Sequence, residues 1–263
     1  MSTNTSIIVT TPYDPDDSAV DAARRCADAI RAPYASRGRR SIAKLRALHQ
    51  ANDVIIVGSG GLEWHTEGAP PFFFHPGMSV VRAKRLLAGD KDTMLEASVF
   101  KPGDQVLDCT AGLASDAIVF SFAGGEATKV TAIESEWPIY FIVSHGLQSY
   151  ESELPELNAA MRRIRLVHGG HLETLRTLPD RSVDIVYFDP MFQAPVGASS
   201  GIGPLRSWAN RGTIQPSAID EAKRVARKSI VLKERRDSAD WDRLGFEQAS
   251  RPGATVGYGV IRL

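Results

Sequence analysis

The chain has 263 residues, of which 43% are hydrophobic and 24% charged, so it can bury the core of one large domain plus an appendage. Lysine plus arginine and aspartate plus glutamate number 31 each, which excludes a uniformly basic nucleic-acid-binding protein and leaves only local charge to attract a polyanion. Two cysteines match neither a disulfide framework nor a metal cluster, and no apolar run approaches about 18 residues, so we expect a cytoplasmic protein without metal or membrane span.

The N-terminal part of the chain predicts a small α/β domain. Apolar runs at residues 6–11 and 54–57 indicate strands, and helices are expected at residues 18–31 and 41–49. We therefore predict an N-terminal α/β domain over residues 1–75.

A strongly basic segment, residues 24–46, lies within this domain. Its single acid, Asp28, is opposed by Arg24, Arg25, Arg31, Arg37, Arg39, Arg40, Lys44 and Arg46. Charge runs of this kind are usually a solvated helical face, and the alternative is a surface that contacts RNA phosphates. Both interpretations stay open here.

The stretch VIIVGSGGLE, residues 54–63, resembles the start of a flavin or nicotinamide fingerprint, which would make the protein an oxidoreductase. The third glycine of that motif would fall at Glu63, and the proline-rich sequence that follows cannot form the helix that carries a pyrophosphate. A hairpin or tight turn is therefore predicted.

Three phenylalanines, residues 72–74, precede His75 and a proline. Such a cluster is typical either of a core or of the wall of a base-stacking pocket, so His75 is a candidate substrate-binding residue. A single helix is expected next, at residues 78–100.

Residues 105–134 predict a strand, a turn of small residues, a helix and a second strand. The first strand ends at Asp108, and the turn contains Thr110, Ala111 and Gly112, where a larger side chain would block close approach of a ligand. Glu134 ends the second strand about 20 residues beyond the turn, where nucleotide-binding units place the acid that holds ribose hydroxyls.

The turn AGLASD does not match a dinucleotide-binding motif. Ala114 stands where a second glycine is needed, and Asp116 at the start of the helix disfavours a phosphate. S-adenosylmethionine is compatible with this turn, because it is a nucleoside with a sulfonium and an amino-acid tail but no phosphate. The alternative is an ordinary strand-turn-helix in which Asp108 and Asp116 only cap.

The alternation of strands and helices continues, which favours a parallel, doubly wound sheet. After a helix at residues 137–150 and a strand at 164–167, the loop HGGH places Gly170 and His171 at a carboxyl strand end, where they could approach an adenine ring. A structural turn is nearly as compatible with this loop, and its histidines are weak evidence for metal.

The stretch VDIVYFDPMF, residues 183–192, predicts an apolar strand that delivers Asp189, Pro190, Met191 and Phe192 to the same sheet edge as Glu134. An acid, a proline and an aromatic suit an exocyclic amine, since oxygens accept its N–H bonds while the aromatic stacks on the base. A purely structural strand-to-turn motif is the alternative.

The last third of the chain continues this pattern. The loop at residues 193–215 is long enough to be functional, and a helix at 214–227 leads to a strand at 229–232. Lys233 at its end either faces a ligand crevice at the carboxyl edge of the sheet or belongs to a solvated turn. Residues 246–249 and 255–262 predict an antiparallel hairpin that closes the sheet.

The motifs VLDCTAGLASDA, RLVHGGH, IVYFDPMF and SIVLKER, in this order, resemble class I S-adenosylmethionine-dependent methyltransferases. They are most similar to the bacterial small-subunit ribosomal RNA guanine-N2 methyltransferase family, over about residues 76–233. The resemblance implies a Rossmann-like methyltransferase domain over residues 76–263, with a mostly parallel, doubly wound seven-stranded sheet ending in an antiparallel hairpin. Ala114-Ser115 and Gly170-His171 depart from the family pattern, which leaves the RNA target open.

The resemblance also implies roles for individual residues. It assigns Ser115, Asp116, Glu134, Ser135, Gly170, His171 and Asp189 to S-adenosylmethionine. The position of the β-strand turn adds Asp108, Thr110, Ala111 and Gly112 to the candidate cofactor-binding residues, and the candidate substrate-binding residues are His75, Met191 and Lys233. The implied reaction is in-line attack of a guanine amine on the sulfonium methyl, with Asp189 and the Pro190 carbonyl orienting the amine, Phe192 stacking on the base, and no metal.

Two alternatives from other classes remain. A methyltransferase of the same fold could act on a small molecule or a protein, because fold does not fix substrate. A non-catalytic RNA-binding module would bind RNA with a steep salt dependence and would not bind the methyl donor. The sequence leaves open the nucleotide, the form of the RNA and the oligomeric state.

Overall fold

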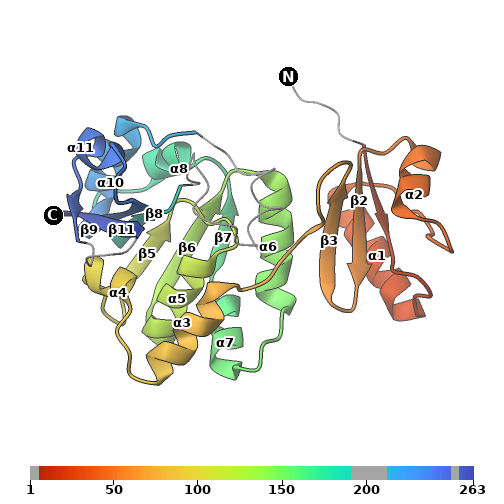
Figure 1. Cartoon of the computed structure of the whole chain (residues 1–263), viewed down its shortest axis with the longest axis horizontal. Helices are drawn as coiled ribbons and strands as arrows, with labels where there is room; N and C mark the ends of the chain where they lie inside the picture. Colours follow the sequence, from red (N-terminus) through yellow and green to blue (C-terminus); the bar gives the residue numbers. More distant parts are fainter. Residues whose placement is uncertain (1–5, 191–211, 250–254) are drawn as a thin grey trace. The chain divides into compact units, whose positions relative to one another are not determined.

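A computed structural model describes residues 6–190, 212–249 and 255–263, which divide into two compact units. One unit holds residues 6–75 and 141–150, and the other holds residues 76–140 and the remaining described residues. Figure 1 shows the elements of both units along the chain.

The first unit is built on a four-stranded sheet in the order β1-β2-β3-β4. Strands β1 and β2 are parallel, and the helical crossover between them makes this pairing possible. Strand β3 pairs antiparallel with β2, and β4 pairs antiparallel with β3. Its elements are β1 (Ile7–Thr10), α1 (Asp17–Ile30), α2 (Ile42–His49), β2 (Asp53–Gly58), β3 (Gly61–Thr66) and β4 (Phe72–Phe73). Asp16 caps α1 and Ser41 caps α2 through side-chain oxygens that accept backbone N–H groups.

The glycine-rich stretch forms the tight turn that the sequence predicts. Gly58 pairs with Gly61 across the β2-β3 hairpin, and Gly61 has a φ of 111°, which favours glycine. Strand β3 stands where a dinucleotide fingerprint needs a helix, so this stretch lacks the element that would carry a pyrophosphate.

The second unit contains a seven-stranded sheet in the order β10-β11-β9-β8-β5-β6-β7. Five neighbouring strands are parallel, and β11 pairs antiparallel with β9 and with β10, which confirms the predicted sheet and its C-terminal hairpin. The strands are β5 (Gln105–Asp108), β6 (Lys129–Glu134), β7 (Arg165–His168), β8 (Val183–Phe188), β9 (Ala226–Arg235), β10 (Glu247–Gln248) and β11 (Val256–Arg262).

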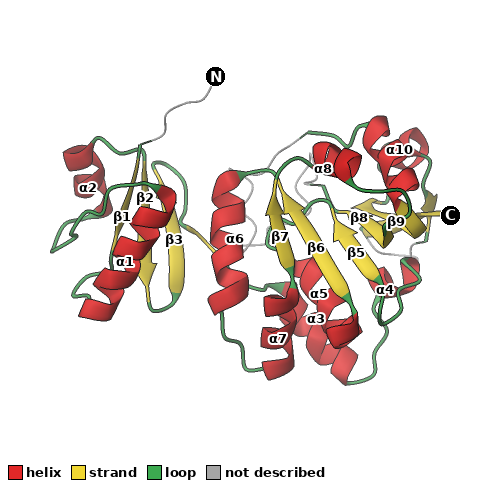
Figure 2. Ribbon diagram, turned by 180° about the vertical axis from the view of Figure 1, so that it is seen from behind, coloured by secondary structure: helices red, strands yellow, loops and turns green. Residues whose placement is uncertain are grey.

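Helices cover both faces of this sheet. On one face α3 (Met78–Leu87), α5 (Ser115–Gly124) and α7 (Pro155–Arg163) pack together, as Figure 1 shows. On the other face α8 (His171–Thr177) packs against α10 (Pro216–Val225), which Figure 2 shows from behind. The second face has a buried apolar core that includes Phe188 and Leu232 from the central strands. Further helices are α4 (Thr93–Ala97), α6 (Trp137–Ser149), α11 (Asp240–Leu244) and a 3₁₀ turn (Gly125–Ala127).

The prediction of a single helix at residues 78–100 is wrong. The chain forms α3 and α4 instead, because Gly89 adopts a φ of 86° and ends the first helix region. The side chain of Asp92 then caps α4 by accepting the N–H groups of Met94 and Leu95. Helices α7 and α11 were not predicted, and β9 is longer than the strand expected at residues 229–232.

Within the described residues, no helix is long and apolar enough to cross a membrane. The same residues contain no group of three or more histidine, cysteine, aspartate or glutamate side chains suited to a metal ion.

Candidate active site

The turn after β5 brings backbone and small side chains to the carboxyl edge of the sheet. Gly112 and Ala114 both have positive φ values, 49° and 59°, which bend the chain sharply into α5. The Ala111 N–H donates to the Ile133 carbonyl over 2.9 Å, so the turn is fixed against the end of β6. This geometry leaves the edge lined by backbone rather than by large side chains.

Glu134 connects the ends of β5 and β6. One carboxylate oxygen accepts the Gly112 N–H and the other accepts the Glu136 N–H, each over 2.9 Å. Burial raises the pKa of Glu134, and these backbone donors act in the opposite direction. Each oxygen keeps a second lone pair, so the carboxylate can also accept hydrogen bonds from sugar hydroxyls.

Asp189 lies directly after β8 and beside the β5 turn. Its backbone N–H donates to the Thr110 hydroxyl over 2.6 Å, and the Cys109 N–H donates to the Tyr187 carbonyl over 2.8 Å. The two neighbouring strand ends are therefore held together at one edge, with Asp108 buried behind them.

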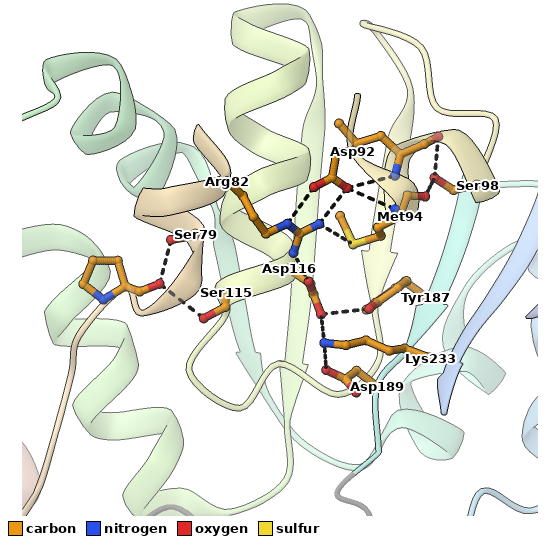
Figure 3. A network of polar contacts seen from close by, with 12 residues as sticks. Ser79, Arg82, Asp92, Met94, Ser98, Ser115, Asp116, Tyr187, Asp189 and Lys233 are labelled. Atoms are coloured by element: carbon orange, nitrogen blue, oxygen red, sulfur yellow. Dashed lines mark hydrogen bonds and ion pairs between the residues drawn. The ribbon is translucent and has the colours of Figure 1, made fainter. Parts of the chain in front are cut away.

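Lys233 bridges two carboxylates at this edge, as Figure 3 shows. Its Nζ lies 2.7 Å from Asp189 Oδ2 and 3.0 Å from Asp116 Oδ2. The Tyr187 hydroxyl donates to the same Asp116 oxygen over 2.8 Å. Asp189 is 27% exposed and Asp116 only 7%, so the lysine joins a partly open acid to a buried one.

Arg82 extends this network to α4. Its Nη1 pairs with Asp116 Oδ1, while Nε and Nη2 bind both oxygens of Asp92 over 2.7 and 2.8 Å. Because Asp92 also caps α4, the guanidinium ties α3, α4 and α5 together (Figure 3).

The charges of the network follow from burial and pairing. Burial would raise the pKa of Asp116, but Lys233 and Arg82 outweigh it and hold that pKa well below its ordinary value. Burial raises the pKa of Asp189 to about 6 against the opposing effect of Lys233. Burial likewise raises the pKa of Asp108 to about 8, with Asp116 and Asp189 adding to the effect. Near neutral pH, Asp189 is a carboxylate and Asp108 a carboxylic acid.

The loop after β7 reaches the same edge. The Gly169 N–H donates to the Glu134 carbonyl over 2.9 Å, and Gly170 is the N-cap residue of α8. His171 begins that helix with its ring 5.8 Å from the ring of Phe188, and burial lowers its pKa, which favours a neutral imidazole.

The other predicted site residues have different surroundings. Ser115 donates its hydroxyl hydrogen to the Pro76 carbonyl, and Ser135 contacts Glu136. His75 belongs to the first unit, where its ring lies 5.9 Å from that of Phe73. Met191, Phe192 and most of the loop at residues 193–215 lie outside the described residues.

Sequence reasoning assigned no role to Arg82, Asp92 or Tyr187. The available signal was a charged residue on an otherwise apolar helix face and a tyrosine within an apolar strand. Neither signal identifies a partner, because the contacts join residues 34 and 71 positions apart.

The residues at this edge fit a cationic nucleoside without phosphate. Glu134 ends β6 and Asp189 follows β8, and both are carboxylates at this edge, whereas Asp108 is neutral and the charge of Asp116 is balanced by Lys233 and Arg82. The Glu134 and Asp189 carboxylates disfavour a phosphate and favour a cationic ligand such as a sulfonium. Backbone N–H groups and the Glu134 carboxylate offer partners for the sugar.

Comparison with known proteins gives a family. A family model described as "Putative SAM-dependent methyltransferase" matches residues 71–200. "Uncharacterized protein YpiP" of Bacillus subtilis is 42% identical over 255 residues, which cover 97% of this chain and 99% of that protein.

Relatives with a named activity match over a shorter region. "Ribosomal RNA small subunit methyltransferase J" of Aeromonas salmonicida is 30% identical over 63% of this chain and 61% of its own length. The protein of that name in Shewanella sediminis is 36% identical over 43% of each chain. A solved structure of a SAM-dependent methyltransferase from Neisseria gonorrhoeae has the same fold, with a TM-score of 0.63, 20% identity, and coverage of 97% of this chain and 95% of that one.

Proposed function

The chain belongs to a family of S-adenosylmethionine-dependent methyltransferases, and from this premise we propose that it methylates the N2 amine of a guanine in small-subunit ribosomal RNA. The observation that carries the site assignment is the Lys233 bridge, which holds the Asp189 carboxylate at the carboxyl edge of the sheet beside Glu134 and the β5 turn. The relatives in Aeromonas and Shewanella, which are named as ribosomal RNA methyltransferases, support the choice of RNA.

Four positions are proposed to hold the cofactor directly. Glu134 accepts the ribose hydroxyls, and the Gly112 backbone leaves room for the nucleoside. Gly170 and His171 lie beside the adenine. S-adenosylmethionine, when bound, supplies a methyl group activated by the positive charge on sulfur. Both oxygens of Asp116 already accept hydrogen bonds, which favours a role for this residue behind the cofactor rather than in direct contact.

Asp189 and Pro190 are proposed to orient the amine. A conjugated exocyclic amine is a weak nucleophile, so positioning and stabilisation of developing positive charge are the effects that a protein can supply. The Asp189 carboxylate and the Pro190 carbonyl can accept its two N–H bonds, and Lys233 fixes the orientation of the carboxylate. Phe192 is proposed to stack on the base and Met191 to line its site.

The N-terminal domain, residues 1–75, is proposed to contact RNA through its basic segment, while residues 76–263 form the methyltransferase domain. Most of that segment is exposed, namely Arg24, Arg25, Arg31, Arg39, Arg40 and Lys44. Exposed cations of this density attract phosphates although the whole chain is neutral. The target guanine would have to be unpaired or unstacked to reach Asp189.

Two measurements test this proposal. Calorimetric titration with S-adenosylmethionine and S-adenosylhomocysteine should show binding to the wild type, which Glu134→Ala weakens more than tenfold by removing the ribose acceptor. The wild type should then transfer radiolabelled methyl groups to small-subunit ribosomal RNA, and the Asp189→Asn variant should not. Cofactor binding without transfer to RNA, combined with transfer to a small molecule or protein, would contradict the RNA assignment.

A further inference from the structure

A pocket of about 310 Å³ lies next to the Arg82 network, within the second unit. Its walls come from three elements: the exposed side of α3, the segment that leads into α4, and β11. The lining includes Met78, Arg82, Arg85, Leu86, Lys91 and Tyr258. Sequence analysis assigned no function to this region, and the proposed cofactor contacts do not use it.

The pocket adjoins the reactive edge. Tyr258 stands directly opposite Lys233 in the antiparallel pairing of β11 with β9, so both side chains project from the same face of the sheet. Arg82, at the opposite wall, is joined to Asp189 through Asp116 and Lys233 (Figure 3). A group in the pocket therefore sits beside the network that holds Asp189.

The pocket combines apolar surface with three cations, Arg82, Arg85 and Lys91, which outnumber its two acids, Asp90 and Asp92. Met78 is 63% exposed, and with Leu86 and the Tyr258 ring it offers apolar and aromatic surface to a flat group. Arg85 and Lys91 have side chains 62% and 78% exposed, and each pairs with one surface acid, Asp90 at 3.0 Å and Glu96 at 3.3 Å. Exposed pairs of this kind contribute little stability, so both cations can turn to a phosphate.

We propose that this pocket binds one unpaired nucleotide of the RNA substrate next to the guanine that is methylated. The base lies against Met78, Leu86 and Tyr258, and its phosphate contacts Arg85 and Lys91. The volume is suitable, since pockets for compact ligands begin at about 300 Å³. This proposal rests on the proposed function, because it requires an RNA substrate.

The test compares two double variants with the same loss of charge. Arg85→Gln with Lys91→Gln removes both rim cations, and Lys84→Gln with Lys129→Gln removes two exposed lysines outside the pocket. We expect the rim variant to raise the KM for RNA about tenfold and, because one phosphate contact is lost, to reduce the slope of log affinity against log salt by about 0.7, whereas the control changes both much less. The S-adenosylmethionine affinity should stay the same in both.

A second pair of variants tests the apolar wall. Met78→Ser should raise the KM for RNA several fold by removing contact with the base, and Leu87→Ser, at a residue 58% exposed on the same helix but outside the pocket, should not. If RNA is methylated and the pocket variants match their controls, the pocket proposal is overturned and the proposed function stands. If the wild type binds S-adenosylmethionine but methylates no RNA, both proposals are overturned.

Discussion

At the scale of single residues, Lys233 controls the charge of Asp189. The lysine stays protonated because Asp116 and Asp189 raise its pKa against the effect of burial. Its removal leaves Asp116 with Arg82 and Tyr187 but takes away the cation that contacts Asp189. Asp116 and Asp189 therefore respond differently to the same substitution.

Lys233→Met should shift the pH profile of methyl transfer. The pKa of Asp189, about 6 in the wild type, rises further when the opposing cation is lost, so the carboxylate forms only at higher pH. We expect the half-maximal point of kcat/KM to move up by about one pH unit, so that kcat/KM falls about twofold at about pH 7 and about tenfold on the acid side of the profile. Profiles recorded across about pH 5 to 9 check this. Lys223→Met, at an exposed position of α10, is the matched control, and equal profiles for the two variants would contradict the role of Lys233.

Asp108→Asn should change how stability depends on pH. The folded-state pKa of Asp108 is about 8 against an ordinary value of 3.8, because burial disfavours its charged form. For an acid with a raised pKa, the contribution to stability is complete below its unfolded pKa and is lost as pH rises through the folded value. In denaturant unfolding, the free energy of unfolding of the variant should rise relative to that of the wild type from about pH 4 to about pH 8, by at most about 1.4 kcal/mol per pH unit. A difference that stays constant across this range would show that Asp108 does not titrate as described.

At the scale of elements, Arg82 is the contact that joins three helices. It lies on α3, forms an ion pair with Asp116 of α5 and forms another with Asp92, the N-cap residue of α4. Replacing it with methionine leaves the Asp92 carboxylate, 11% exposed, without the Arg82 cation, and leaves the Asp116 carboxylate, 7% exposed, with Lys233 but without Arg82. Removing one partner of a buried ion pair destabilises a protein more than replacing both partners with apolar residues, because the remaining charge stays buried without a partner.

Arg82→Met should lower the free energy of unfolding by about 3–5 kcal/mol. Lys84→Met is the control, because the Lys84 side chain is 56% exposed and pairs with the exposed Glu153 over 3.8 Å, and it should change the free energy of unfolding by less than about 0.5 kcal/mol. Scanning calorimetry of both variants beside the wild type measures the difference as a shift of Tm. A similar small shift in both would mean that solvent reaches the Asp92 and Asp116 carboxylates.

The same elements show what sequence could predict. The turn at Gly112, Glu134 at the end of β6 and Asp189 after β8 were predictable, because apolar periodicity locates strand ends and parallel strands gather those ends at one edge. The break between α3 and α4 was missed, since the residues around Gly89 are compatible with one long helical pattern. The partners of Asp116 were missed because they depend on how α3 packs against α5, which no local pattern encodes.

At the scale of the whole molecule, the charges that balance overall are unevenly distributed. Acids lie at the carboxyl edge of the seven-stranded sheet, whereas residues 24–46 carry eight cations against one acid. A neutral chain is not drawn to RNA by its overall field, so under the proposed function the RNA affinity comes from such local surfaces. Their contribution is separable, because each phosphate contact releases counterions and adds to the salt dependence of binding.

Neutralising part of the basic segment should therefore weaken RNA binding without affecting the cofactor. Arg39→Gln, Arg40→Gln and Lys44→Gln together remove three exposed cations, and Lys101→Gln, Lys129→Gln and Lys223→Gln remove three from exposed positions elsewhere. If each of the first three contacts a phosphate, the slope of log affinity against log salt falls by about 2 and RNA affinity near physiological salt falls about tenfold or more, while S-adenosylmethionine titrations stay the same. Equal losses in both triple variants would mean that the RNA responds only to net charge, and the N-terminal domain would then have no specific part in holding it.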